Sequence, residues 1–236
     1  MELQGRTFSI LGDSISTYLG YSNNTSYNTA IGGNAVAYGP SKMHVSQTWW
    51  YRLISCDGMR LCVNNSFSGA CVGPSAEPGA NTYLDRCLHL DNDTLHCAPD
   101  LIFVFMGAND YKNGDYPVGE FLPNSEPPSG TFACYYYRMI EKVKAKFPRA
   151  RICLLSVLPN RFTERTRQDT EGHILKTYNA AIEETGNRFG ADFIDLQHLT
   201  GITYRNCEQY YFDKLHPTAV GMERIYTSVS LYLHSH

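Results

Sequence analysis

The 236-residue chain has no hydrophobic run long enough to cross a membrane and no block of like charges. Its longest strongly apolar run covers residues 101–106, whereas a spanning helix needs about 20 apolar residues. Lysine and arginine (20) nearly balance aspartate and glutamate (23), and the net charge of −3 provides no positive field that would attract nucleic acid. The sequence therefore predicts neither a membrane span nor a nucleic-acid partner.

The eight cysteines include no CxxC pair, and Cys62 and Cys153 lie inside apolar runs typical of strands. A chain of this size can build a core without a disulfide framework, so we expect reduced, mostly buried thiols. His89, His96 and Cys97 match no zinc-binding pattern, and no metal site is expected. The residues before position 7 do not resemble a signal peptide, which favours a cytoplasmic protein.

Short apolar runs alternate with amphipathic segments along the whole chain. The runs at 7–11, 60–64, 101–106, 152–158 and 192–196 are nearly continuous, as buried parallel strands are. Apolar residues recur at three- and four-residue steps within 132–147, 174–189 and 222–233, which predicts helices. We therefore expect one α/β domain over residues 1–236, a three-layer α/β/α sandwich around a parallel sheet of about five strands.

Two motifs follow the first two predicted strands. Gly12, Asp13 and Ser14 bring a serine hydroxyl to the carboxyl edge of the sheet, where ligands bind in open parallel sheets. They lack the second glycine of the Gly-x-Ser-x-Gly elbow of α/β-hydrolases. Residues 64–69 end in Gly69, whose N–H a ligand can approach because the residue has no Cβ. Each motif alone is equally typical of an ordinary turn.

Two further motifs carry an amide and an imidazole. Asn109 and Asp110 directly follow the predicted strand at 101–106, and an asparagine amide at a strand end can donate to a developing oxyanion. Asp213 lies three residues before His216, just ahead of a predicted helix. This spacing lets the carboxylate accept from Nδ1–H and leaves Nε2 free to act as a base.

In this order, the four motifs resemble the conserved blocks of the SGNH/GDSL family of serine hydrolases, from residue 7 to about residue 233. Ile15 stands where many members have leucine. The resemblance implies a flavodoxin-like sheet, with Ser14 as nucleophile, His216 as base and Asp213 orienting the imidazole.

The same resemblance implies an oxyanion hole and no cofactor. Its donors would be the backbone N–H groups of Ser14 and Gly69 and the side-chain amide of Asn109. No metal or organic cofactor is required. Three further polar residues of these motifs are expected to hold turns through hydrogen bonds to backbone N–H groups. They are Asp13, Asn64 and Asp110.

The segments 21–42, 111–130 and 159–172 are polar and longer than ordinary loops, which is typical of binding walls. The tyrosines at 18, 21, 27 and 38 lie among small polar residues, as in a sugar-binding loop and equally in an ordinary surface loop. Trp49 and Trp50 begin a predicted helix, so either both pack in the core or one reaches the cleft.

No segment offers a long apolar patch for a lipid surface. We therefore expect a serine esterase for short acyl groups, with a small-molecule or carbohydrate ester as substrate and acetyl esters of carbohydrates as the leading class. The alternatives are an acyltransferase, in which an alcohol replaces water, and a lipid or thioester acylhydrolase. A carbohydrate-binding protein on an inactive scaffold is disfavoured because every residue that the reaction would need is present. These residues are Ser14, Gly69, Asn109, Asp213 and His216. The oligomeric state stays open.

Overall fold

The computed structural model describes residues 2–18, 20, 21, 43–74, 86–123 and 125–236. Its centre is a five-stranded sheet in the order β2-β1-β3-β4-β5, with every neighbouring pair parallel. The strands are β1 (Thr7–Gly12), β2 (Arg60–Ser66), β3 (Leu101–Phe105), β4 (Arg151–Leu155) and β5 (Asp192–Ile194). The predicted parallel sheet of about five strands is confirmed.

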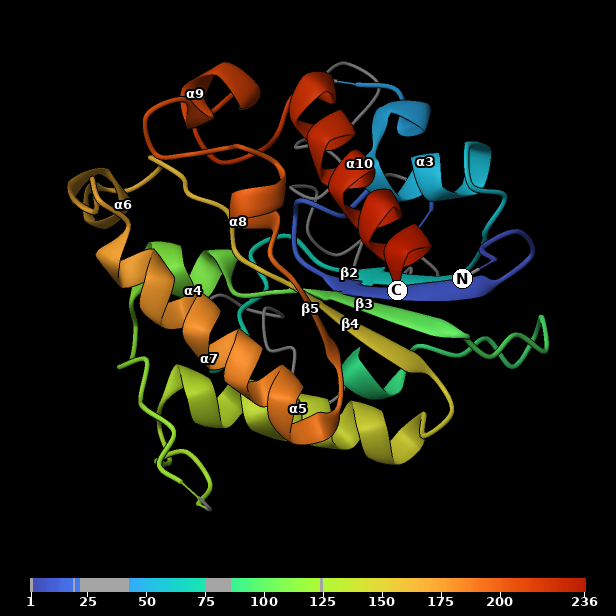
Figure 1. The fold of residues 1–236 in the computed structure, drawn as a ribbon, viewed down its shortest axis with the longest axis horizontal. Helices are drawn as coiled ribbons and strands as arrows, with labels where there is room; N and C mark the ends of the chain where they lie inside the picture. The colour runs from blue at the N-terminus through green and yellow to red at the C-terminus, as the bar shows by residue number, and fades with distance from the viewer. Residues whose placement is uncertain (1, 19, 22–42, 75–85, 124) are drawn as a thin grey trace.

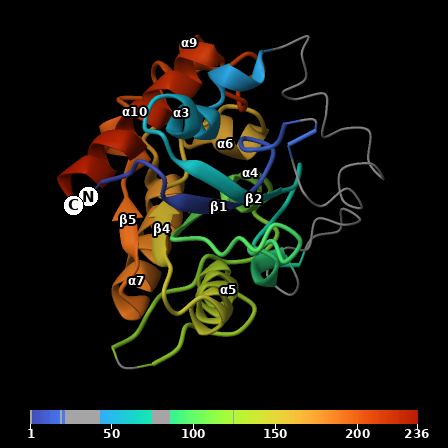
Figure 2. The same cartoon turned by 90° about the vertical axis from the view of Figure 1, so that its right-hand side faces the viewer.

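Helices cover both faces of this sheet (Figures 1 and 2). On one face lie α3 (Trp49–Ser55) and α10 (Ala219–Ser235), and on the other lie α5 (Phe132–Lys146) and α7 (His173–Phe189). The predicted helices within 132–147, 174–189 and 222–233 correspond to α5, α7 and α10, so the three-layer sandwich is confirmed.

Short helices lie in the segments between these elements, and two of them, α4 and α8, begin within three residues of the ends of β3 and β5. They are η1 (Val45–Gln47), η2 (Arg86–Leu88), α4 (Ala108–Asn113), α6 (Glu164–Gln168), α8 (Leu196–Leu199) and α9 (Cys207–Tyr210). No helix in the described part of the chain is both long and apolar enough to cross a membrane.

Apolar packing against the central strands fixes the position of α3. All five residues of β3 are buried, and the indole of Trp49 makes edge-to-face contacts with Phe103 and Phe105. Trp49 and Trp50 are both completely buried. Of the two arrangements compatible with the sequence, the core position therefore holds for both tryptophans.

β4 and β5 are shorter than their apolar runs because the residues that follow each strand make hydrogen bonds outside the sheet. The Asn179 amide of α7 binds both the N–H (2.8 Å) and the C=O (3.0 Å) of Val157, beyond the end of β4. Asp195 caps α8 by accepting from the N–H of His198, which ends β5 at Ile194.

The long loops fall only partly within the described residues. Tyr27 and Tyr38, expected in a possible sugar-binding loop, lie outside them. Tyr18 is buried, with its hydroxyl donating to the carbonyl of Met43. Tyr21 packs against Trp50 and Tyr51. The eight cysteines are free thiols, and five of them are buried: Cys62, Cys71, Cys87, Cys153 and Cys207.

Candidate active site

The turn after β1 holds Ser14 in one backbone conformation. Asp13 accepts from the N–H of Ile15 at 2.9 Å, and its carbonyl accepts from the N–H of Ser16 at 3.1 Å. The hydroxyl of Thr17 donates to the Ser14 carbonyl at 3.1 Å. Ser14 itself is 4% exposed, so the turn holds it almost completely out of solvent.

Buried side chains from two other elements hold the far end of this turn. The amide of Asn64, on β2, donates to the Ser16 carbonyl at 2.8 Å, and the indole N–H of Trp49 donates to the Ser16 hydroxyl at 3.1 Å. A Cβ at Gly12 would come within 2.7 Å of the Ser66 hydroxyl oxygen. Glycine therefore allows the turn to lie this close to the end of β2.

His216 and Asp213 reach Ser14 from the loop that precedes α10. The Oγ of Ser14 lies 2.7 Å from Nε2 of His216, and Nδ1 of His216 lies 2.6 Å from Oδ2 of Asp213. The other carboxylate oxygen of Asp213 accepts from the backbone N–H of His216 at 2.7 Å. The carboxylate thus fixes both the backbone and the ring of the histidine, which is the geometry of a serine activated by a histidine base.

The electrostatics of this chain keep Asp213 ionised. Burial raises the pKa of Asp213, but hydrogen bonds from the ring and backbone N–H of His216 outweigh burial, and the net shift is downward. A carboxylate that remains charged can stabilise an imidazolium on the histidine that it orients.

Local strain and one backbone contact shape the Asp213–His216 turn. Lys214 has φ of +73°, a left-handed conformation that a non-glycine residue rarely adopts. Its carbonyl accepts from the N–H of Arg161 at 3.0 Å, which anchors the turn to the segment after β4. Strain of this kind persists only where the surrounding contacts determine it, and it occurs most often at functional sites.

Three candidate oxyanion donors lie at the ends of β1, β2 and β3. Within the described residues, neither the N–H of Ser14 nor that of Gly69 donates to a protein acceptor. Gly69 has φ of +76°, and no atom lies within 4 Å of a Cβ built there. The Asn109 amide donates to the Ala70 carbonyl at 2.9 Å, which uses one of its two N–H donors and leaves the second.

Asp110 connects the turn after β3 to the segment that follows Gly69. Its carboxylate accepts from the N–H of Val72 at 3.0 Å, from the N–H of Gly73 and from the Tyr116 hydroxyl. Burial raises the pKa of Asp110 to about 6, against the opposing effect of these hydrogen bonds. Asp110 and Asn109 together fix the spacing between the ends of β2 and β3.

Asn64 behaves differently from the expectation. It makes no hydrogen bond to a backbone N–H within the described part of the chain; its amide donates to the Ser16 carbonyl, and its carbonyl oxygen accepts from the Ser66 hydroxyl at 2.6 Å. The physical reason is the position of Asn64: it lies on β2, where its backbone is paired, and its amide points toward the buried Ser16 carbonyl of the turn after β1.

Arg86 is a buried cation beside the turn after β1. Its guanidinium donates to the Gly12 carbonyl at 2.7 Å and to the Asn65 carbonyl at 2.5 Å. These carbonyls lie at the ends of β1 and β2, so one side chain ties both strand ends together. No sequence motif marks this residue, because a lone arginine at the start of a three-residue helix belongs to no periodic pattern.

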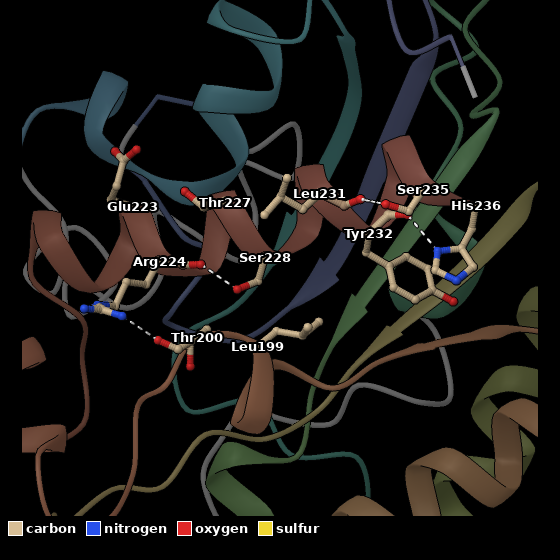
Figure 3. Close-up of a pocket in the computed structure, with 10 residues that line it drawn as sticks. All are labelled: Leu199, Thr200, Glu223, Arg224, Thr227, Ser228, Leu231, Tyr232, Ser235 and His236. Carbon is tan, nitrogen blue, oxygen red and sulfur yellow. Dashed lines mark hydrogen bonds between the residues drawn. The ribbon is translucent and has the colours of Figure 1, made fainter.

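A separate surface hollow of about 320 Å³ lies between α8 and α10 (Figure 3). Its lining comes from the end of α8 and from α10 with the residue that follows it, and it includes none of Ser14, Asp213 and His216. The hollow is therefore distinct from the Ser14–His216–Asp213 chain. No cluster of three metal-binding side chains occurs among the described residues.

Comparisons with known proteins agree with this architecture. The family model described as "GDSL-like Lipase/Acylhydrolase" matches residues 6–233. No curated protein matches the chain closely enough to count as a relative.

Solved structures share the fold. A putative GDSL-like lipase from Bacteroides ovatus is 24% identical, with a TM-score of 0.65 over 99% of this chain and 100% of its own. A lipase/acylhydrolase from Enterococcus faecalis is 19% identical, with a TM-score of 0.59 over 98% and 96%. A carbohydrate acetylesterase from Sinorhizobium meliloti is 13% identical, with a TM-score of 0.66 over 98% and 99%.

Proposed function

The chain belongs to the GDSL-like lipase/acylhydrolase family, and from this premise we propose that it is a serine hydrolase that removes short acyl groups, acetyl in particular, from carbohydrate esters. The observation that carries the proposal is the continuous hydrogen-bonded chain from Ser14 through His216 to Asp213, with contacts of 2.7 and 2.6 Å. A serine hydroxyl is a weak nucleophile until such a base accepts its proton.

In the first half of the reaction, the Ser14 oxygen attacks the ester carbonyl carbon while its proton passes to Nε2 of His216. The carbonyl oxygen becomes an oxyanion, stabilised by the N–H groups of Ser14 and Gly69 and by the Asn109 amide. The tetrahedral intermediate collapses when His216 returns the proton to the alcohol oxygen, so the alcohol leaves and the acyl group stays on Ser14.

In the second half, water replaces the alcohol. His216 takes a proton from water, the resulting hydroxide attacks the acyl carbon, and the proton then returns to Ser14 as the carboxylic acid departs. Asp213 remains charged throughout and stabilises the imidazolium at each transfer.

Two observations support a short acyl group on a polar alcohol. Exposed large hydrophobic residues in the described part of the chain lie in several loops and helices, and two of them, Leu199 and Leu231, line the hollow between α8 and α10. The full set is Tyr21, Leu95, Leu122, Phe162, Leu199, Phe212, Val220 and Leu231. A long acyl chain needs a continuous apolar surface to recover its burial energy. One structural neighbour is a carbohydrate acetylesterase, which makes acetylated sugars the first natural substrates to test.

The test is kcat/KM on p-nitrophenyl acetate, butyrate, octanoate and palmitate, with Ser14→Ala in parallel. We expect kcat/KM to fall as the acyl chain lengthens and activity to disappear in the variant. Activity that rises with chain length would replace the short-acyl proposal with a lipid or thioester substrate. Activity retained in Ser14→Ala would refute the serine mechanism.

A covalent probe and a product analysis complete the test. A fluorophosphonate should label the wild-type protein and Ser55→Ala, in which an exposed serine of α3 is removed, but should not label Ser14→Ala. Product analysis with an added acceptor alcohol separates hydrolysis from acyl transfer, because a transferase forms a new ester in place of the free acid.

A further inference from the structure

The segment that carries His216 folds back on itself. Tyr211 and Pro217 form an isolated antiparallel bridge, and the N–H of Phe212 donates to the His216 carbonyl at 3.1 Å. Residues opposite each other in an antiparallel pair place their side chains on the same side. Phe212 is therefore a direct cross-strand neighbour of the histidine.

The two side chains are in ring contact. The ring centroids of Phe212 and His216 are 5.8 Å apart, and their planes differ by 18°, an offset parallel stack. Phe212 is 37% exposed, whereas Phe8, Phe67, Phe103, Phe105 and Phe132 are almost completely buried. An aromatic side chain next to the proposed base thus keeps part of its surface accessible.

The proposed reaction places the alcohol of the substrate beside this surface. His216 must return its proton to the leaving oxygen, so that oxygen must come within about 3 Å of Nε2. The carbon skeleton of the alcohol starts one bond further on, in the neighbourhood of the ring that is stacked on the imidazole. The acyl carbonyl, in contrast, is directed toward the donors at Gly69 and Asn109.

We propose that Phe212 forms the wall of the alcohol subsite and favours ester substrates whose alcohol is a ring with an accessible C–H face, as in a pyranose. The inference rests on the proposed serine esterase function and specifies its substrate. Aromatic faces contact such rings through dispersion and through their negative quadrupole, which attracts the C–H groups of the sugar.

This role predicts an effect on one half of the reaction only. The alcohol is present while Ser14 is acylated, but it has left before water attacks the acyl-enzyme. Loss of the Phe212 ring should therefore change kcat/KM according to the alcohol and leave the rate of acyl-enzyme hydrolysis unchanged. A contact of this type changes kcat/KM about two- to tenfold.

The experiment compares acetates that differ only in the alcohol. Cyclohexyl acetate and n-hexyl acetate have the same number of carbons, and an acetylated methyl glucoside adds the sugar itself. In Phe212→Ala, we expect kcat/KM to fall about two- to tenfold for the two ring alcohols and much less for n-hexyl acetate. Phe212→Trp should restore the preference.

Leu231→Ala is the matched control, because it removes an exposed apolar side chain (63% exposed) on α10, in the hollow that His216 does not line (Figure 3). This variant should leave the ratio of cyclohexyl to n-hexyl acetate unchanged.

Equal losses on every acetate, or a shifted pH profile of kcat/KM, would overturn the proposal, because Phe212 would then act by orienting His216. An unchanged cyclohexyl-to-hexyl ratio would overturn it as well. Failure of the esterase function itself is distinguishable, because it would appear in the wild-type protein as absent hydrolysis or as activity that survives Ser14→Ala.

Discussion

Asp13 lies immediately before Ser14, and its carboxylate is buried away from water. It is 1% exposed, and its Oδ2 has no hydrogen-bond partner among the described residues. Burial raises the pKa of Asp13 from 3.8 to about 6, although the N–H of Ile15 and the charges of His216 and Arg86 act in the opposite direction. We predict that Asp13→Asn, which keeps the shape and the acceptor for Ile15, removes a pH-dependent cost of folding.

The sign of the effect follows from proton binding. Between pH 3.8 and about 6, Asp13 is protonated to a greater extent in the folded protein than in the unfolded chain. The free energy of unfolding therefore decreases as the pH rises. A shift of about 2 pKa units corresponds to about 3 kcal/mol, at about 1.4 kcal/mol per unit. This cost is absent below the unfolded pKa and is fully present above the folded one.

Urea denaturation of both proteins between pH 4 and 8 measures this contribution. The free energy of unfolding of Asp13→Asn minus that of the wild type should increase by about 2.5 kcal/mol between pH 4 and 7 and then stay nearly constant. The asparagine NH₂ group adds an offset that does not depend on pH, so the slope is the test. Asp110, whose pKa is also raised to about 6, is present in both proteins, so its contribution to the difference in unfolding free energy largely cancels. A flat difference curve would refute the reasoning.

Two other substitutions test the oxyanion donors and the buried cation. Asn109→Ala should lower kcat on p-nitrophenyl acetate about 10²–10³-fold with little change in KM, because the amide acts mainly on the developing oxyanion; a loss confined to KM would contradict this role. Arg86→Met should lower the free energy of unfolding in urea by about 2–4 kcal/mol, because the carbonyls of Gly12 and Asn65 lose their charged donor. A change below about 1 kcal/mol would show that water or other groups replace the guanidinium.

Hydrophobic periodicity was sufficient to predict the sheet and the long helices, because burial on both faces makes parallel strands almost continuously apolar. It could not predict where β4 and β5 end. Ser156 and Val157 are as buried as the strand before them, and only the amide of Asn179, which lies on another element, removes Val157 from the ladder. Periodicity detects burial, whereas the boundary depends on a tertiary hydrogen bond.

The residues of the candidate site also fall into those that a sequence motif reveals and those that only the three-dimensional structure reveals. Ser14, Asn109 and His216 could be found because each belongs to a short motif next to a strand or helix end. Arg86 and Phe212 could not, because their importance depends on long-range geometry. Arg86 matters through two carbonyls on β1 and β2, and Phe212 matters through the bridge that pairs its segment with that of His216.

The strand order explains why the serine follows β1. The chain passes from β1 to β2 through α3 on one face of the sheet and from β3 to β4 through α5 on the other (Figure 1). Such a reversal opens a crevice outside the carboxyl ends of the central strands. At β1 both neighbouring strands, β2 and β3, lead directly into backbone or amide donors, at Gly69 and Asn109. A serine after β4 or β5 would lack at least one of these neighbours, so the order β2-β1-β3 is what brings together the motifs that the proposed reaction uses.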